Sequence, residues 1–182
     1  LDLSIDCAAK KTEKGSNWGI GAICGHRGRR VVLDDRTAKY DIIEFVEVVK
    51  QMVRDWEPDK ILIEDKAAGN DLKIRLIAEM QRGDMPMVEI KWSKPGNASK
   101  MERLHACKGV IANGFVHLLE GQPGLVEWVD EVCGFPAHKF NDRVDYLTQC
   151  LNEHIEDELG GYGDSLPDCP VCGMRMTRGR ML

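Results

Sequence analysis

The sequence predicts an α/β domain in which helices flank a mixed sheet. Three strand-type runs come first, and segments with helical spacing then alternate with short buried runs. At 182 residues, with 43% hydrophobic and 30% charged residues, the chain has the composition of one globular domain with a sizeable core. We expect this domain to span residues 1–159. Residues 160–182, which begin with a glycine-rich stretch and contain CPVC, are expected to form a flexible tail or a small appendage.

The first part of the chain predicts three antiparallel strands. Residues 1–7 alternate apolar side chains with Asp2, Ser4 and Asp6, which is the two-residue period of a strand. Two further strand-type runs lie near residues 18–24 and 30–33. Turn-forming residues separate the three runs, so a meander is expected.

Helices and strands then alternate. Apolar residues from Ile42 to Trp56 recur at intervals of three and four, and Pro58 marks the end of that helix. The alternation predicts that the middle of the chain adds parallel strands. The remaining predicted elements are a strand at 60–64, a helix at 72–80, a strand at 87–92, a helix at 99–113 ended by Gly114, a strand at 115–118, and helices at 125–132 and 144–155.

Three groups of carboxylates stand where these elements begin or end. Asp6 ends the first strand, Glu64 and Asp65 follow the KILI run, and Asp142 and Asp145 open the last helix. A single acid of this kind is most simply a solvated surface charge, but the joint placement favours one acidic site. Carboxylate oxygens suit Mg²⁺ or Mn²⁺, and two such ions roughly 3.5–4 Å apart can promote phosphodiester cleavage.

The acids lie within four ordered motifs. These are SIDCAAK with the GSNWGIGAI hairpin, ILIEDKAAG, KPGNASKMERLHA and FPAHKFNDRVDYLTQ. From about residue 1 to about residue 155, the chain resembles the nuclease domain of the large terminase subunit of tailed bacteriophages, the DNA-packaging motor. The resemblance implies a ribonuclease H-like fold and a metal-dependent endonuclease that cuts concatemeric double-stranded viral DNA during genome packaging.

The resemblance also implies roles for individual acids. Asp6 would bridge two Mg²⁺ or Mn²⁺ ions, Glu64 would hold one, and Asp142 would complete the catalytic site, with Asp65 and Asp145 as alternative ligands. Helical geometry leaves the third ligand open. A helical Asp142 would point away from the buried stripe of its helix, and Asp145 would lie nearer the edge of that stripe. An Asp142 that caps the helix would escape this angular rule, so we rank Asp142 first.

Basic residues near the acids are expected to contact the DNA backbone. They are Lys94, Lys100 and Arg103 around the KPGNASKMER segment, and Lys139 and Arg143 beside the last acidic group. The alternative is a solvated helix start or a surface role. The net charge of −5 excludes a uniformly basic surface, but it leaves room for local basic clusters.

The cysteines indicate the redox compartment of the protein and a possible zinc site. There are seven, an odd number placed mostly in apolar patterns, which indicates reduced thiols in a reducing compartment. Cys169 and Cys172 of CPVC resemble one half of a zinc site, but no second CxxC follows. Cys133, Cys150 or His154 could supply the missing ligands.

Other features concern partners and location. No GxxxxGK[ST] loop occurs, so ATP hydrolysis is not expected of this chain. The resemblance implies an ATPase domain before Leu1, portal and small terminase subunits as further partners, and the cytoplasm of the infected host cell as the location. No apolar run has the length of a membrane span. Two alternatives stay open: another ribonuclease H-like nuclease, such as a junction resolvase or transposase core, and a non-catalytic DNA-binding or docking module.

Overall fold

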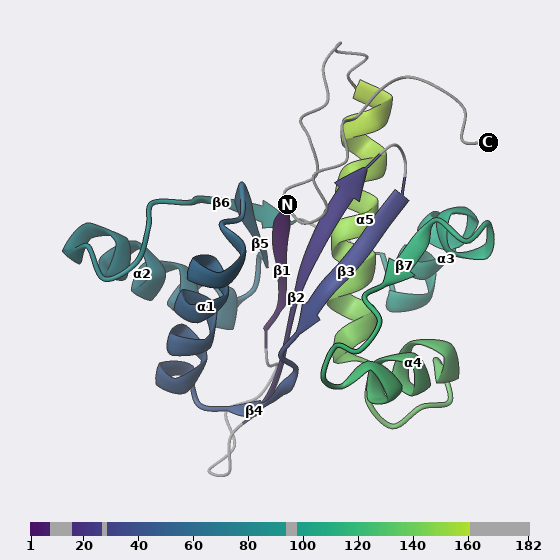
Figure 1. The fold of residues 1–182 in the computed structure, drawn as a ribbon, viewed down its shortest axis with the longest axis horizontal. Helices are drawn as coiled ribbons and strands as arrows, with labels where there is room; N and C mark the ends of the chain where they lie inside the picture. The colour runs from purple at the N-terminus through teal and green to yellow at the C-terminus, as the bar shows by residue number, and fades with distance from the viewer. Residues whose placement is uncertain (8–15, 27–28, 94–97, 161–182) are drawn as a thin grey trace.

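A central mixed sheet organises the protein. The computed structural model describes residues 1–7, 16–26, 29–93 and 98–160. In these residues the sheet has seven strands in the order β6-β5-β1-β2-β3-β7, and β4 pairs with β2 beside this path (Figure 1). The strands are β1 (Asp2–Asp6), β2 (Ser16–His26), β3 (Arg29–Asp35), β4 (Ala38–Tyr40), β5 (Lys60–Glu64), β6 (Glu89–Ser93) and β7 (Val116–Leu118).

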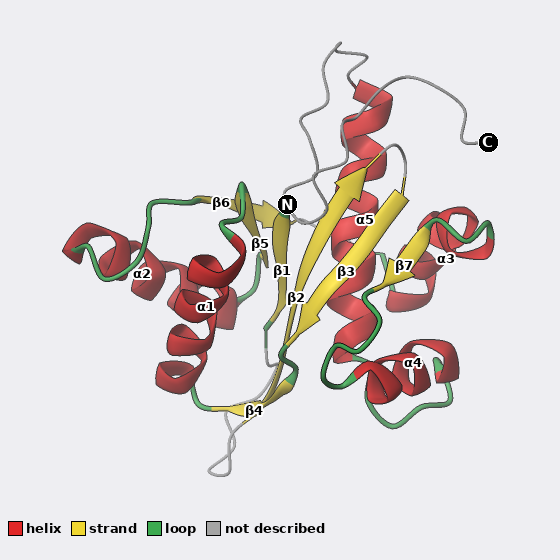
Figure 2. Cartoon of the chain, in the orientation of Figure 1, coloured by secondary structure: helices red, strands yellow, loops and turns green. Residues whose placement is uncertain are grey.

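Helices lie on both sides of this sheet (Figure 2). They are α1 (Ile42–Trp56), α2 (Ala67–Arg82), α3 (Lys100–Ala112), α4 (Leu125–Gly134) and α5 (Asp142–Gly160). In the described part of the chain, no helix combines the length and the apolar character that crossing a membrane requires. The C-terminal residues 161–182, including Cys169 and Cys172, lie outside the described residues, and so does Lys94.

The predicted topology is confirmed. Strands β1, β2 and β3 form an antiparallel meander, and β5 and β6 add parallel strands beside β1. Several element bounds differ from the sequence prediction; helix α2, for example, begins at Ala67 instead of residue 72. Strand β4 was not predicted, because its three residues are too few and too polar to show a strand period. Helix α5 starts at Asp142 instead of Val144, so Asp142 is its first residue and not its cap.

Each face of the sheet has its own hydrophobic core. One core joins the sheet to α1 and α2 through residues such as Leu3, Phe45 and Leu72. The other joins it to α3, α4 and α5 through Leu62 and Tyr146, among others. Alternate residues of each strand point to opposite faces, so a strand can contribute to both cores.

The polar residues of β1 are buried instead of solvated. Asp2, Ser4 and Asp6 share the face that meets α5, and each of them is at most 9% exposed. Ser4 Oγ donates to the Tyr146 carbonyl oxygen (2.7 Å), and Gln149 Nε2 donates to Ser4 Oγ (3.1 Å). Buried polar groups of this kind need such partners. The hydrogen bonds therefore fix how α5 lies along β1.

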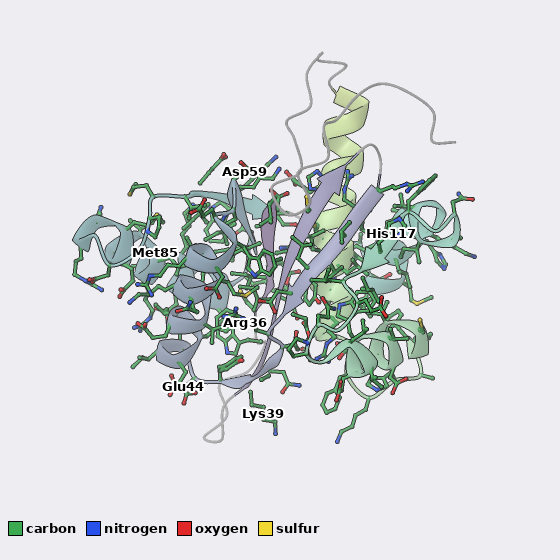
Figure 3. All side chains as sticks on the ribbon, in the orientation of Figure 1. Arg36, Lys39, Glu44, Asp59, Met85 and His117 are labelled. Carbon is green, nitrogen blue, oxygen red and sulfur yellow. The ribbon has the colours of Figure 1, made fainter. Side chains whose placement is uncertain are left out.

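The opposite face is held by caps and ion pairs around α1. Asp41 accepts from the backbone N–H groups of Ile43 and Glu44, and the Glu44 carboxylate accepts from the Asp41 N–H. This is a capping box, whose spacing is readable in the sequence. Arg36 lies between the end of β3 and α1 and donates to Asp55 at 2.6 Å (Figure 3). The contact links α1 to the sheet.

Candidate active site

Two buried acids meet at one edge of the sheet. Strands β1 and β5 are parallel neighbours, and each ends in an acid, Asp6 and Glu64. The carboxyl ends of parallel neighbours lie at the same edge, which is where ligands bind in open α/β sheets. Asp6 is 9% exposed and Glu64 is 2% exposed. Both residues lie where the sequence places them, at the ends of their strands.

The first turn of α5 brings two more acids to the same edge. Asp145 is 4% exposed, whereas Asp142 is half-buried and accepts a hydrogen bond from Asn17 Nδ2 (3.2 Å). Gly19 pairs with Asp6 across β1 and β2. A Cβ atom on Gly19 would lie 3.0 Å from the Asp142 carbonyl oxygen. The absence of a side chain there lets α5 approach the end of β1.

The four carboxylates act on one another electrostatically. Burial raises the pKa of Asp6 well above its ordinary value, and the negative charges of Asp145, Glu64 and Asp142 raise it further. Burial also raises the pKa of Asp145, against the opposing effect of Lys100 and Arg103. The acids therefore lie near enough to one another at this sheet edge for their charges to interact, and a cation there would favour the ionised forms.

Among the described residues, three cations partly balance the charge of these acids. Lys100 forms an ion pair with Asp145 and donates to Asn141 Oδ1 at 2.7 Å. Arg103 donates from Nη2 to Asp145 Oδ1 (2.8 Å), and its Nη1 lies 3.6 Å from Glu64 Oε1. Lys66 Nζ lies 2.6 Å from Glu64 Oε2. Lys100 and Arg103 are one turn apart at the start of α3, where a capping box on Ser99 fixes the helix.

The donor set fits a hard divalent cation. It consists of carboxylate oxygens, which Mg²⁺ and Mn²⁺ prefer, and it is partly buried. The raised pKa of Asp6 arises in part from like charges, and a bound cation would relieve that repulsion. Asp6, Glu64, Asp145 and Asp142 are therefore the residues that could hold such an ion once it draws their carboxylates together, because among the described residues no three of them bring oxygen atoms within 4.8 Å of one another.

The other predicted residues differ in their surroundings. Asp65 is exposed, and its backbone N–H donates to the Ser93 carbonyl oxygen (3.0 Å). Lys139 is exposed, with Nζ 5.1 Å from the centre of the Phe140 ring. Arg143 is engaged inside the protein, because it pairs with Asp35 Oδ2 and Glu131 Oε2, each at 2.8 Å. These pairs hold α5 against β3 and α4.

Two site residues were missed from the sequence. Asn17 carries no recognisable signal, because it lies in a predicted turn and reaches Asp142 only through the fold. Lys66 follows the acidic pair directly and contacts Glu64. Its position next to Glu64 is a signal that could have identified it, since an adjacent cation is a simple partner for a buried acid.

The start of α2 packs closely against the end of β5 at Gly69, in the KAAG turn that follows Glu64. A Cβ atom on Gly69 would lie 2.3 Å from the Glu64 carbonyl oxygen, so α2 can start here only with a glycine. We expect Gly69→Ala to lower the free energy of unfolding by about 1–3 kcal/mol, as overpacking does. The matched control is Gly109→Ala in α3, where nothing lies within 4 Å of the added carbon.

Urea unfolding of both alanine variants measures this effect. Gly109→Ala should be neutral or stabilising, because alanine favours a helix over glycine by up to about 1 kcal/mol. Equal unfolding midpoints for the two variants would show that α2 can shift away from β5 without cost.

The fold is similar to those of several solved nuclease structures. The human cytomegalovirus terminase nuclease domain matches with a TM-score of 0.64 and 10% identity, over 86% of this chain and 84% of that chain. Thermus thermophilus RuvC in complex with a Holliday junction substrate matches with a TM-score of 0.53 and 12% identity, over 87% of this chain and 95% of that chain. The Fowlpox virus resolvase in complex with substrate Holliday junction DNA matches with a TM-score of 0.53 and 11% identity, over 86% of this chain and 99% of that chain.

These similarities establish the fold. No model of a protein family matches the sequence, and no curated protein matches it either. Identities of 10–12% show a shared architecture and not a shared substrate. The fold is ribonuclease H-like, as the resemblance of the sequence motifs implies, and the expected likeness to a terminase nuclease domain is confirmed at this level.

Proposed function

We propose that this protein is a metal-dependent endonuclease that cuts concatemeric double-stranded viral DNA, as the nuclease part of a bacteriophage large terminase subunit. The observation that carries the proposal is that Asp6, Glu64 and the first-turn acids of α5 lie at one edge of the sheet, with Asp6, Glu64 and Asp145 buried. A fold shared with a terminase nuclease domain supports it, and so does the order of the four sequence motifs.

The acids would hold Mg²⁺ or Mn²⁺ ions. Asp6 lies centrally, since the charges of Glu64, Asp142 and Asp145 all act on it, and this suits a residue that bridges two ions. A pair of such ions supplies an activated water and stabilises the departing oxygen of a phosphodiester. The carboxylates would position the ions.

The basic residues would bind the DNA backbone. Lys100 and Arg103 neutralise the acids in this structure, and with metal bound they would be free to turn toward phosphate oxygens. Lys139 is exposed and would be a further phosphate contact. Arg143 is a weaker candidate because its guanidinium already pairs with two carboxylates.

A junction-cutting nuclease is the second candidate. Two of the similar structures are described with Holliday junction DNA, and they share the fold at comparable coverage. The terminase hypothesis has more support from the sequence, which carries the late FP motif followed by the acids of α5. It also implies an ATPase domain, portal and small terminase subunits as partners, in the cytoplasm of the infected host cell.

A comparison of substrates separates the candidates. Supercoiled plasmid, linear duplex and a four-way junction should be incubated with the protein and Mg²⁺ or Mn²⁺. We expect plasmid nicking and linearisation, complete loss with EDTA, and no preference for the junction. Symmetric cutting of the junction with an intact plasmid would favour a resolvase. DNA binding without cleavage in either metal would favour a docking module.

A further inference from the structure

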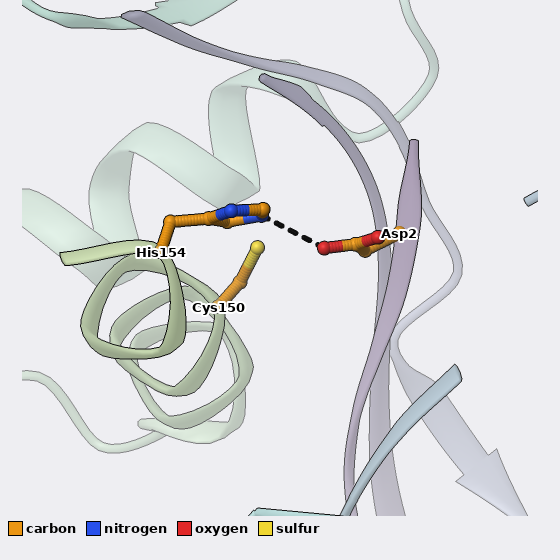
Figure 4. Close-up of side chains that lie close together, drawn as sticks. All are labelled: Asp2, Cys150 and His154. Atoms are coloured by element: carbon orange, nitrogen blue, oxygen red, sulfur yellow. Dashed lines mark ion pairs between the residues drawn. The ribbon is translucent and has the colours of Figure 1, made fainter. Parts of the chain in front are cut away.

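A second cluster of possible metal ligands lies at the other end of β1. Asp2, Cys150 and His154 place one ligand atom each within 4.8 Å of the other two (Figure 4). Asp2 begins the strand that Asp6 ends, so the two clusters are about 13 Å apart at ~3.3 Å per residue. The acidic cluster and this one therefore cannot share an ion.

The spacing of the ligands suits coordination of one ion. Cys150 and His154 are four residues apart on α5, so their side chains lie on the same face of the helix. This face meets β1, and Asp2 points toward it from the strand (Figure 4). Two ligands one helical turn apart, with a third from a facing element, make a common arrangement at zinc sites.

The ligand atoms are buried and imperfectly paired. Asp2 is 3% exposed and Cys150 is fully buried. Asp2 Oδ2 and His154 Nε2 lie 2.7 Å apart, yet neither makes a hydrogen bond of acceptable geometry. Buried polar atoms normally have such a partner, so these two atoms call for an explanation. An ion bound beside them would coordinate both atoms after a small outward movement of the two side chains, since tetrahedral zinc ligands lie roughly 3.3 Å apart.

We propose that Asp2, Cys150 and His154 bind one Zn²⁺ ion, at a site separate from the acidic cluster. A thiolate, an imidazole and a carboxylate are the ligand types of zinc, whereas Mg²⁺ prefers oxygen alone. The Cys150 thiol would release its proton to solvent as the sulfur coordinates the ion. A water molecule would complete four-coordination.

The surrounding charges leave the site close to neutral. Lys60 Nζ lies 3.8 Å from Asp2 Oδ2 and 3.8 Å from Glu153 Oε1. Lys91 also pairs with Glu153. With Asp2 and the Cys150 thiolate, a divalent ion would be balanced by two negative charges. Bound zinc would tie α5 to β1, and α5 carries Asp142 and Asp145 at its other end.

Cobalt binding tests the proposal on the full chain. Co²⁺ reports a thiolate ligand through a charge-transfer absorption band, and a Cys169→Ser/Cys172→Ser background removes the CPVC thiols. We expect one Co²⁺ with this band, displaced by Zn²⁺, and a higher melting temperature with metal. His154→Gln and Cys150→Ser should abolish the band or weaken Co²⁺ binding at least about tenfold. Cys133 is exposed, so Cys133→Ser is the matched control and should retain both the thiolate band and the affinity for Co²⁺.

Two results would overturn the proposal. One is the absence of a thiolate band in the background protein at saturating Co²⁺. The other is an unchanged band and affinity in His154→Gln, a variant at a partly exposed position that should keep the fold. Either result would leave Asp2 and His154 as an ion pair only. Circular dichroism of Cys150→Ser would separate a lost ligand from a lost core contact.

Discussion

Replacing Asp6 with asparagine is expected to lower DNA cleavage at least about 100-fold while making the protein more stable. Mutation of a residue that only supports a metal ligand already lowers metal affinity or activity by about 10–100-fold. Asp6 lies at the centre of the acids and should have a larger effect. The stabilisation follows from the cost of burying the ionised Asp6 and from the repulsion that Asp145, Glu64 and Asp142 exert on it. An amide of the same shape removes that repulsion, and each kcal/mol regained raises the melting temperature by about 2–4 °C.

The stabilisation by Asp6→Asn should depend on pH with a defined sign. The pKa of Asp6 is raised in the folded protein, so as pH rises the unfolded chain loses this proton first. Stability is therefore lost from the ordinary value of about 3.9 up to the raised pKa, and the deficit persists above it. The asparagine variant should melt higher than the parent at pH 7. This difference should vanish below pH of about 3.9.

Melting curves in EDTA between pH 3 and pH 8, together with plasmid cleavage in Mn²⁺, measure both effects. Asp71→Asn, which removes an equal charge from a half-buried position of α2 paired with Arg75, is the matched control and should change neither by more than a surface ion pair contributes. Added Mn²⁺ should raise the melting temperature of the parent more than that of Asp6→Asn. Full cleavage by Asp6→Asn would exclude Asp6 as a metal ligand and the proposed site with it.

Local patterns predicted the fold because they agree with one another along this chain. The alternation in β1, the three-and-four spacing of α1 and its capping box at Asp41 each act within a few residues. Asp6 and Glu64 could also be predicted, since an acid at the carboxyl end of a parallel strand reaches the same edge as its neighbour.

The remaining features depend on contacts between distant segments. The polar face of β1 is compatible with solvent or with a polar helix, and only the packing of α5 through Gln149 decides between them. Arg143 is basic and near the acids in sequence, but Asp35 and Glu131 come from other elements to pair with it. Which of Asp142 and Asp145 is the better candidate for the third metal ligand depends on the residue at which α5 begins. A shift of one residue in that start changes the answer.

That starting point makes Asp145 the stronger candidate for the third ligand. The Asp145 N–H donates to the Asn141 carbonyl oxygen (3.1 Å), so Asn141 occupies the capping position and Asp142 is already helical. The angular rule then applies to Asp142 and turns it away from the buried stripe. In agreement, Asp142 is half-buried, whereas Asp145 is 4% exposed and acts on Asp6 more strongly than any other charge.

We therefore expect Asp145→Asn to lower cleavage at least about 100-fold, and Asp142→Asn to lower it by about tenfold or less, as for a supporting residue. The two variants are matched, since both lie in the first turn of α5 and lose the same charge. Initial rates of plasmid cleavage across a Mn²⁺ titration separate weaker metal binding from slower chemistry. If Asp142→Asn lowered cleavage more than Asp145→Asn, Asp142 would again be ranked first, as predicted from its possible role as a helix cap. This result would mean that the metal-bound protein draws Asp142 away from Asn17 and leaves Asp145 paired with Lys100 and Arg103.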